Sequence, residues 1–125
     1  MAGETIINQL KEDFQFVKKN PAILGVMLYG SHLTDDNTVR SDIDVCIVVP
    51  NYNLYEIYRF VMSKLKNHIN DYDIRFFEEL PLHIKGEIIE NGKVIIAADE
   101  PALYEYFFPF RKEWEDQKFR LKQLI

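Results

Sequence analysis

The chain has 125 residues, a formal net charge of −5 and one cysteine. Its length fits one domain, and its 47% hydrophobic and 14% aromatic residues are typical of a globular protein, not a disordered one. The composition excludes an internal disulfide framework and argues against generic binding of polyanions, and no apolar run reaches the roughly 18 residues of a membrane span. We therefore expect one cytoplasmic domain over residues 1–125, with no membrane association and no direct nucleic-acid binding.

Helices and strands are predicted to alternate along the chain. The helices are indicated by apolar residues at helical spacing, and the strands by short apolar runs between turn residues. In chain order we predict a helix at 4–19, a strand at 22–29, a polar loop or short helix at 31–41, a strand at 42–49, a helix at 53–69, a strand at 72–77, a helix ending near Asn91, a strand at 93–97 and a helix at 100–123. This order is typical of an α+β sandwich, in which helices flank a small mixed sheet of about three to four strands.

Local signals set the ends of the later elements. Gly92 is expected to take the left-handed conformation that commonly ends a helix. Asp99 is expected to cap the last helix, whose first turn tolerates Pro101. Pro109 lies inside that helix and removes a backbone donor, so we expect a kink or a split near Phe108.

Two aspartates stand at the start of a strand that is otherwise apolar. Asp42 and Asp44 in "SDIDVCIVV" are two residues apart, so their side chains point to the same face of the strand. A polar turn before the strand would also explain them. Asp73 in "YDIRFF" supplies a third carboxylate on the next strand, and three converging carboxylates need a counter-charge. Mg²⁺ takes oxygen ligands and completes its shell with water and phosphates, so it would supply that charge.

A Gly-Ser pair ends the strand that precedes the two aspartates. Gly30 allows a sharp turn and lets the backbone approach a phosphate closely. Backbone amides and the Ser31 hydroxyl can hold that phosphate. The pair and the aspartates therefore indicate two parts of one phosphate and metal site.

The spacing of these residues matches a known pattern. "GS", ten residues and then "DID" resembles the signature of the DNA polymerase β-like nucleotidyltransferase superfamily and, within it, the minimal nucleotidyltransferases (MNT). The segment "YDIRFFEELPLHIKGEIIENGKVIIAAD" is similar to the one in which these proteins carry a third acidic residue, a Leu-Pro pair and a helix that ends in glycine. "LYEYFFPFRKEWEDQKFR" resembles their C-terminal helix, so the resemblance covers roughly residues 20–122.

The resemblance implies a nucleotidyltransferase fold, ATP as the substrate and two Mg²⁺ ions. It implies that Gly30 and Ser31 position the nucleoside triphosphate. Asp42 and Asp44 would bind the metals, and Asp73 would help to bind the catalytic one. In such a reaction a hydroxyl attacks the α-phosphorus and pyrophosphate leaves, while two metals about 3.5–4 Å apart stabilise both oxygens. The three aspartates are thus the expected catalytic and metal-binding residues.

The segment after Ser31 departs from the family pattern. Many relatives carry an arginine directly after Gly-Ser and a glycine a few residues later. Here His32 replaces the arginine, while Asp35 and Asp36 add negative charge near the expected phosphates. The affinity for the triphosphate and the choice of nucleotide therefore stay open, and Arg40 either compensates or is simply solvated.

Two charged residues flank Asp73 on the same predicted face. Asp71 follows a polar turn, whereas Asp73 has the apolar neighbours of a strand, so we choose Asp73 as the ligand and leave Asp71 as a helper. Arg75 has two interpretations of equal weight. It forms a local ion pair of little energetic value, or it contacts a phosphate or braces the acidic cluster.

A core of this kind without a second large domain resembles the antitoxins of HEPN/MNT toxin–antitoxin pairs. That resemblance implies transfer of AMP from ATP to a tyrosine hydroxyl of a HEPN-type ribonuclease toxin. The main alternative is a non-catalytic module that neutralises a toxin by contact alone. A transferase acting on a small molecule is a third possibility, against which the absence of a substrate domain counts.

The end of the chain carries more apolar surface than a terminal helix of a small domain readily hides. The residues concerned are Phe110, Trp114, Phe119, Leu121, Leu124 and Ile125. An exposed apolar patch often marks a binding site for a partner, and a solvated helix face is the alternative. The acidic balance of the chain suits a basic ribonuclease as that partner.

Overall fold

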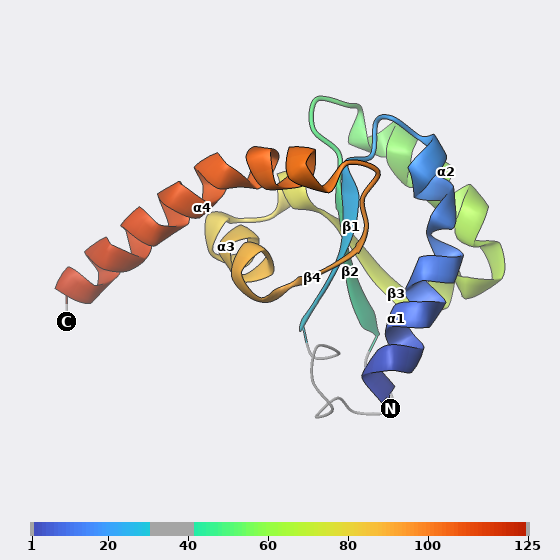
Figure 1. Ribbon diagram of the computed structural model, residues 1–125, viewed down its shortest axis with the longest axis horizontal. Coiled ribbons are helices and arrows are strands. Elements are labelled where there is room, and N and C mark those ends of the chain that lie inside the picture. The colour runs from blue at the N-terminus through green and yellow to red at the C-terminus, as the bar shows by residue number, and fades with distance from the viewer. Residues whose placement is uncertain (1, 31–41, 125) are drawn as a thin grey trace.

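The computed structural model describes residues 2–30 and 42–124. Within these ranges a four-stranded mixed sheet forms the centre of the molecule (Figure 1). Its strands are β1 (Gly25–Tyr29), β2 (Ile43–Val48), β3 (Tyr72–Phe76) and β4 (Lys93–Ile96). In the order β3-β2-β1-β4, β1 is antiparallel to β2 and β4, whereas β2 is parallel to β3. The predicted α+β class and the predicted strands are confirmed, and the loop or short helix predicted at 31–41 lies outside the described residues.

Helical segments connect the strands and end the chain. They are α1 (Ala2–Asp13), η1 (Gln15–Lys19), α2 (Leu54–Leu65), η3 (Lys66–Asp71), η4 (Phe77–Glu79), α3 (Leu82–Asn91) and α4 (Glu100–Gln123), where η marks a 3₁₀ helix. The two helices predicted at 4–19 and 53–69 each end early and continue as a 3₁₀ segment. Lys66, at the end of α2, has a φ of 43°, a left-handed conformation that stops the regular helix. No helix in the described ranges is long and apolar enough to cross a membrane.

The sheet has an apolar core on each face. Helices α1 and α2 cover one face, where Phe14, Val45 and Val61 belong to one buried cluster (Figure 1). Helices α3 and α4 cover the other face, where Cys46 and Leu103 belong to a second cluster. Alternate residues of β2 enter opposite cores, as the pleat of a strand requires. The expected role of Cys46 in core packing is confirmed, because its side chain is fully buried.

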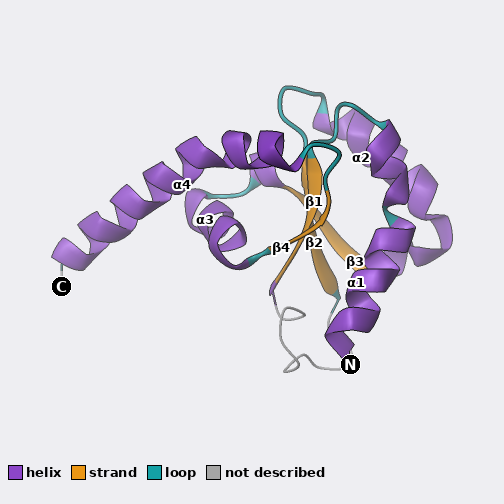
Figure 2. Cartoon of the chain, in the orientation of Figure 1, coloured by secondary structure: helices purple, strands orange, loops and turns teal. Residues whose placement is uncertain are grey.

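Of the local predictions for the later elements, the one for Gly92 is wrong and the one for Asp99 is confirmed; at Pro109 the split is absent, and the kink stays a prediction. Gly92 has a φ of −69° and is extended, because β4 begins at the next residue and the chain runs straight into the sheet. Pro109 does not split α4, which Figure 2 shows as one helix. Pro109 is exposed, so water can reach the carbonyl of Glu105 that its ring leaves without a donor. Asp99 caps the helix as predicted, since its carboxylate accepts a hydrogen bond of 3.1 Å from the Ala102 amide.

Helix α4 packs on α3 in its middle and projects away from the sheet at its C-terminal end (Figure 1). The contact with α3 is close at Gly86, where an added Cβ would lie 2.1 Å from Cδ1 of Trp114. An ion pair between Lys118 and Glu90 also joins the two helices. Gly86 therefore lets the indole lie against the backbone of α3.

Replacing Gly86 with alanine is expected to destabilise the protein by about 1–3 kcal/mol, because Trp114 must move out of its place. Chemical denaturation would measure this. In a Trp114→Ala background the same substitution is expected to be neutral or stabilising by up to about 1 kcal/mol, since alanine favours a helix over glycine. Equal destabilisation in both backgrounds would contradict the role given to this contact.

Candidate functional site

Three polar side chains form a row across the sheet. Tyr29 of β1 pairs with Asp44 of β2, and Asp44 pairs with Asp73 of β3. Asp44 shares the strand face of Cys46, which belongs to the core beneath α3 and α4. Asp73 lies on that face too, because its neighbour Tyr72 packs in the opposite core. Two of the three predicted carboxylates are thus cross-strand neighbours on one face.

Gly30 closes the row at the end of β1. Its φ is +80°, a conformation that residues with a side chain rarely adopt. A Cβ built on this residue would lie 2.3 Å from Oδ2 of Asp44. The Asp44 carboxylate therefore lies directly against the Gly30 backbone. The glycine of the predicted phosphate site and a predicted metal ligand are thus in contact.

The other predicted site residues lie at the border of the described chain. Asp42 immediately precedes β2 and is exposed. Ser31 lies outside the described residues, as do His32 and Arg40. The structure thus brings Gly30, Asp44 and Asp73 together and leaves the roles of Ser31 and Asp42 as predictions.

Arg75 forms an ion pair with Asp73. Its Nε lies 3.2 Å from Oδ1 of Asp73, and the two side chains are 59% and 38% exposed. The hydrogen bond to Asp73 and the charge of that carboxylate raise the pKa of the Arg75 guanidinium, and Asp44 adds to the effect. A pair with this exposure contributes little to stability. The local ion pair, one of the two interpretations of Arg75 that the sequence left open, is therefore present.

Tyr29 is a neighbour of the acidic pair that the sequence pattern did not reveal. Burial, followed by the charges of Asp44, Cys46 and Asp73, raises the pKa of its phenol to about 12, and the charge of Arg75 opposes this rise. The phenol stays protonated at neutral pH and remains a hydrogen-bond donor. The one sequence signal for Tyr29 is its position next to Gly30 at the end of a predicted strand, and only the register of β1 with β2 places it beside Asp44.

The carboxylate oxygens of the row are the kind of ligand that a hard divalent cation binds. Carboxylate oxygens are the ligands that Mg²⁺ prefers, and Asp44 and Asp73 present them from adjacent strands. Among the residues that the structure describes, no three His, Cys, Asp or Glu side chains are already arranged to hold a metal. The fit to Mg²⁺ therefore rests on the chemistry of the donors and on their register.

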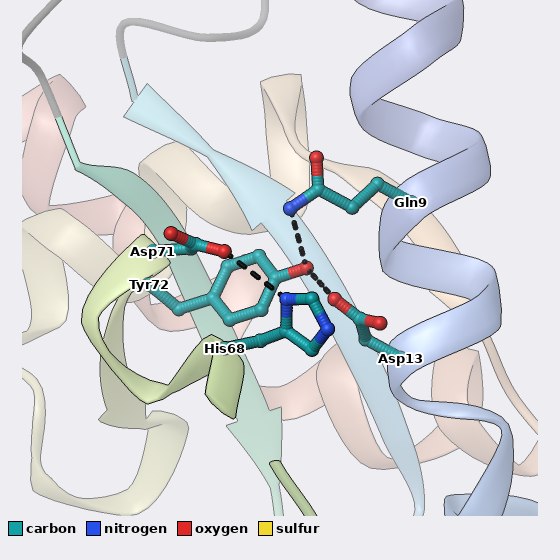
Figure 3. Close-up of polar contacts among 5 residues, drawn as sticks. All are labelled: Gln9, Asp13, His68, Asp71 and Tyr72. Carbon is teal, nitrogen blue, oxygen red and sulfur yellow. Dashed lines mark hydrogen bonds and ion pairs between the residues drawn. The ribbon is translucent and has the colours of Figure 1, made fainter. Parts of the chain in front are cut away.

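A second polar cluster lies near the same end of β3 and ties α1 to the sheet (Figure 3). The Tyr72 hydroxyl donates a hydrogen bond to Asp13 and accepts one of 3.1 Å from Nε2 of Gln9. Burial and the Asp13 carboxylate raise the pKa of Tyr72. Asp71 belongs to η3, and its Oδ2 lies 3.3 Å from Nδ1 of His68. The Asp71 carboxylate thus contacts His68, and its role as a helper of Asp73 stays a prediction.

Comparison with known proteins gives the family. The profile described as "Polymerase beta, Nucleotidyltransferase" matches residues 8–101. The chain belongs to this family. It is therefore a nucleotidyltransferase, and the matched range contains Gly30 and the row of Tyr29, Asp44 and Asp73.

One curated relative is a protein of Methanocaldococcus jannaschii named "Putative protein adenylyltransferase". It is 46% identical to this nucleotidyltransferase over 101 residues, which cover 81% of this chain and 77% of the relative. Among solved structures, a mutant MntA–HpeT toxin–antitoxin complex has a TM-score of 0.59 at 14% identity, covering 98% of this chain and 91% of the other.

Two further structures share this fold. The complex of a tri-AMPylated Shewanella oneidensis HEPN toxin with its MNT antitoxin has a TM-score of 0.58 at 13% identity, covering 97% and 90% of the two chains. A toxin–antitoxin structure with AMP-PNP has a TM-score of 0.59 at 15% identity, covering 98% and 91%. The nucleotidyltransferase described here thus has the fold of these chains.

Proposed function

We propose that this nucleotidyltransferase is an antitoxin that moves AMP from ATP to a tyrosine hydroxyl of a HEPN-type toxin in an Mg²⁺-dependent reaction in the cytoplasm. The observation that carries the proposal is the register of Asp44 and Asp73 beside Gly30. The name of the M. jannaschii relative supports a protein as the acceptor. The AMPylated toxin complex supports a HEPN toxin, and the AMP-PNP structure supports a nucleotide substrate.

The chemistry follows from the placement of these side chains. Asp42, Asp44 and Asp73 would hold the Mg²⁺ ions, and the family resemblance implies two of them. These ions would neutralise the phosphates and lower the pKa of the attacking hydroxyl. The backbone of Gly30 would lie close to the triphosphate, and the Ser31 hydroxyl would donate a hydrogen bond to a phosphate oxygen.

Bond making and breaking occur at the α-phosphorus. The tyrosine oxygen forms a bond to the α-phosphorus. At the same time the bond between the α-phosphorus and the oxygen that bridges to the β-phosphorus breaks, and pyrophosphate leaves. Asp73, on the edge strand of the sheet, would accept the hydroxyl proton directly or through a water. The products are the AMP-tyrosine ester and pyrophosphate.

Helix α4 supplies the surface that we assign to the toxin. Its projecting end carries Phe119, Leu121 and Leu124, which are 62%, 48% and 82% exposed. Phe108 lies on the same helix and is 52% exposed. Large apolar side chains exposed on one helix are typical of a protein interface. The net charge of −5 favours a basic partner.

The same surface favours a second candidate function, in which the protein neutralises a toxin by contact alone. Contact through α4 would need neither ATP nor the acidic row. The two functions differ in whether the toxin gains a covalent AMP.

Incubation with MgATP and a co-expressed HEPN-type partner is expected to add AMP to a partner tyrosine, which peptide mass spectrometry would detect. The control is the same incubation with ATP and EDTA in place of Mg²⁺, which is expected to add none. A stable complex with no AMP on either chain would support neutralisation by contact and contradict adenylyl transfer.

A further inference from the structure

Arg75 is placed to act on both carboxylates of the row. It follows Asp73 by two residues on β3, so the two side chains lie on the same face. The register sets Arg75 opposite Cys46, one pair further along the strands than Asp44 and Asp73. Asp73 raises the pKa of the Arg75 guanidinium most, and the charge of Asp44 raises it as well.

The position of β3 leaves Arg75 free to move. β3 is an edge strand in the sheet order, and 59% of the Arg75 side chain is exposed. The pair with Asp73 is a single Nε–Oδ1 contact, and an exposed pair of this kind costs little to break. Arg75 can therefore leave Asp73 when a stronger partner is present.

The charge balance of the site changes when substrate binds. Without a cation, Asp44 and Asp73 repel each other across adjacent strands, and Arg75 offsets part of that repulsion. With a cation and a nucleoside triphosphate, Asp73 has a stronger counter-charge and the phosphates bring new negative charge. A guanidinium binds phosphate oxygens in a planar two-bond geometry, so the triphosphate is then its better partner.

We infer that Arg75 exchanges partners: it holds Asp73 in the cation-free protein and turns to the phosphates of the bound nucleotide. The inference rests on the proposed function, because it assumes that Asp73 takes part in binding the cation. The arginine thus competes with the cation for Asp73 and assists the nucleotide. A solvated ion pair would do neither.

The test measures cation and nucleotide binding separately. Binding of Mn²⁺ alone would be followed by electron paramagnetic resonance, and binding of AMP-PNP at saturating Mg²⁺ by calorimetry. In Arg75→Met the affinity for Mn²⁺ alone is expected to rise about two- to fivefold. The affinity for AMP-PNP is expected to fall about tenfold. Arg75→Lys keeps the charge but not the planar donors, so its loss of AMP-PNP affinity should be smaller.

The control is Arg111→Met on α4. Arg111 is similarly exposed, at 51%, and its Nε lies 3.6 Å from Oε1 of Glu115, so the variant removes the same charge from a comparable pair. Both affinities should match those of the wild type.

The partner exchange predicts a higher affinity for Mn²⁺ and a lower affinity for AMP-PNP in Arg75→Met, and this combination distinguishes it from the alternatives. Unchanged affinities in Arg75→Met would show a solvated ion pair, and losses in both would show a structural role. Either result would overturn the exchange while leaving the proposed function intact. A wild-type protein that binds neither Mn²⁺ nor AMP-PNP would overturn the proposed function and the exchange together.

Discussion

Asp44→Asn is expected to lower the rate of AMP transfer at least about a thousandfold while the protein stays folded. The amide keeps the shape of the side chain but removes the charge that lies between Tyr29 and Asp73 in the row. A cation bound there would lose a carboxylate ligand, and the triphosphate would lose its counter-charge. Mass spectrometry of the partner at successive times would measure the rate.

Asp71→Asn is the matched control. It removes the same charge two residues before Asp73, at an exposed position whose carboxylate contacts His68. Its rate should stay within about twofold of the wild type, as is usual for a surface substitution. Asp44→Asn with a wild-type rate would rule out a catalytic role for the row.

The same variant separates the two candidate functions in the cell. Asp44→Asn leaves α4 unchanged, so the complex with the toxin should still form. If AMP transfer is what silences the toxin, co-expression with this variant should leave the toxin active. Full protection by the variant would instead show that contact is sufficient.

The segments that form strands, and the face to which each of their side chains points, could be predicted because both depend on residues close in sequence. The apolar runs around Val26, Val45 and Ile95 mark β1, β2 and β4 with only their ends misplaced. Alternation alone puts Asp44 on the face opposite Ile43. The Asp99 cap is equally local.

Strand order and register could not be predicted in this way. The pairing of Asp44 with Asp73 depends on β2 lying parallel to β3, which packing across the whole sheet decides. Tyr29 was missed for the same reason, since only the antiparallel register of β1 brings it beside Asp44. The extended Gly92 likewise depends on the immediate start of β4, which outweighed the usual preference of glycine at a helix end.

Gly30→Ala is expected to destabilise the protein by about 2–3 kcal/mol and to weaken AMP-PNP binding at least about tenfold. The φ of +80° costs an alanine about 1–2 kcal/mol, and its methyl group would lie 2.3 Å from the Asp44 carboxylate. Asp44 must then leave the position that the row gives it. Chemical denaturation and calorimetry would measure the two effects.

Gly25→Ala, at the opposite end of β1, is the control. An added Cβ there would meet a methyl group of Leu103 at 3.1 Å, with no positive φ to oppose it. We expect a loss below about 1.5 kcal/mol and unchanged binding of AMP-PNP. An equal loss of binding in both variants would show that general destabilisation of β1, not the approach of Gly30 to Asp44, causes it.

A double variant separates strain from function. Adding Asp44→Ala to Gly30→Ala removes the clash, so roughly half of the lost stability should return while the backbone cost at residue 30 remains. AMP-PNP binding should not return, because the carboxylate itself is gone. Recovery of both would mean that AMP-PNP binding does not need the Asp44 carboxylate. Recovery of stability alone would show that the collision with this carboxylate causes that part of the lost stability.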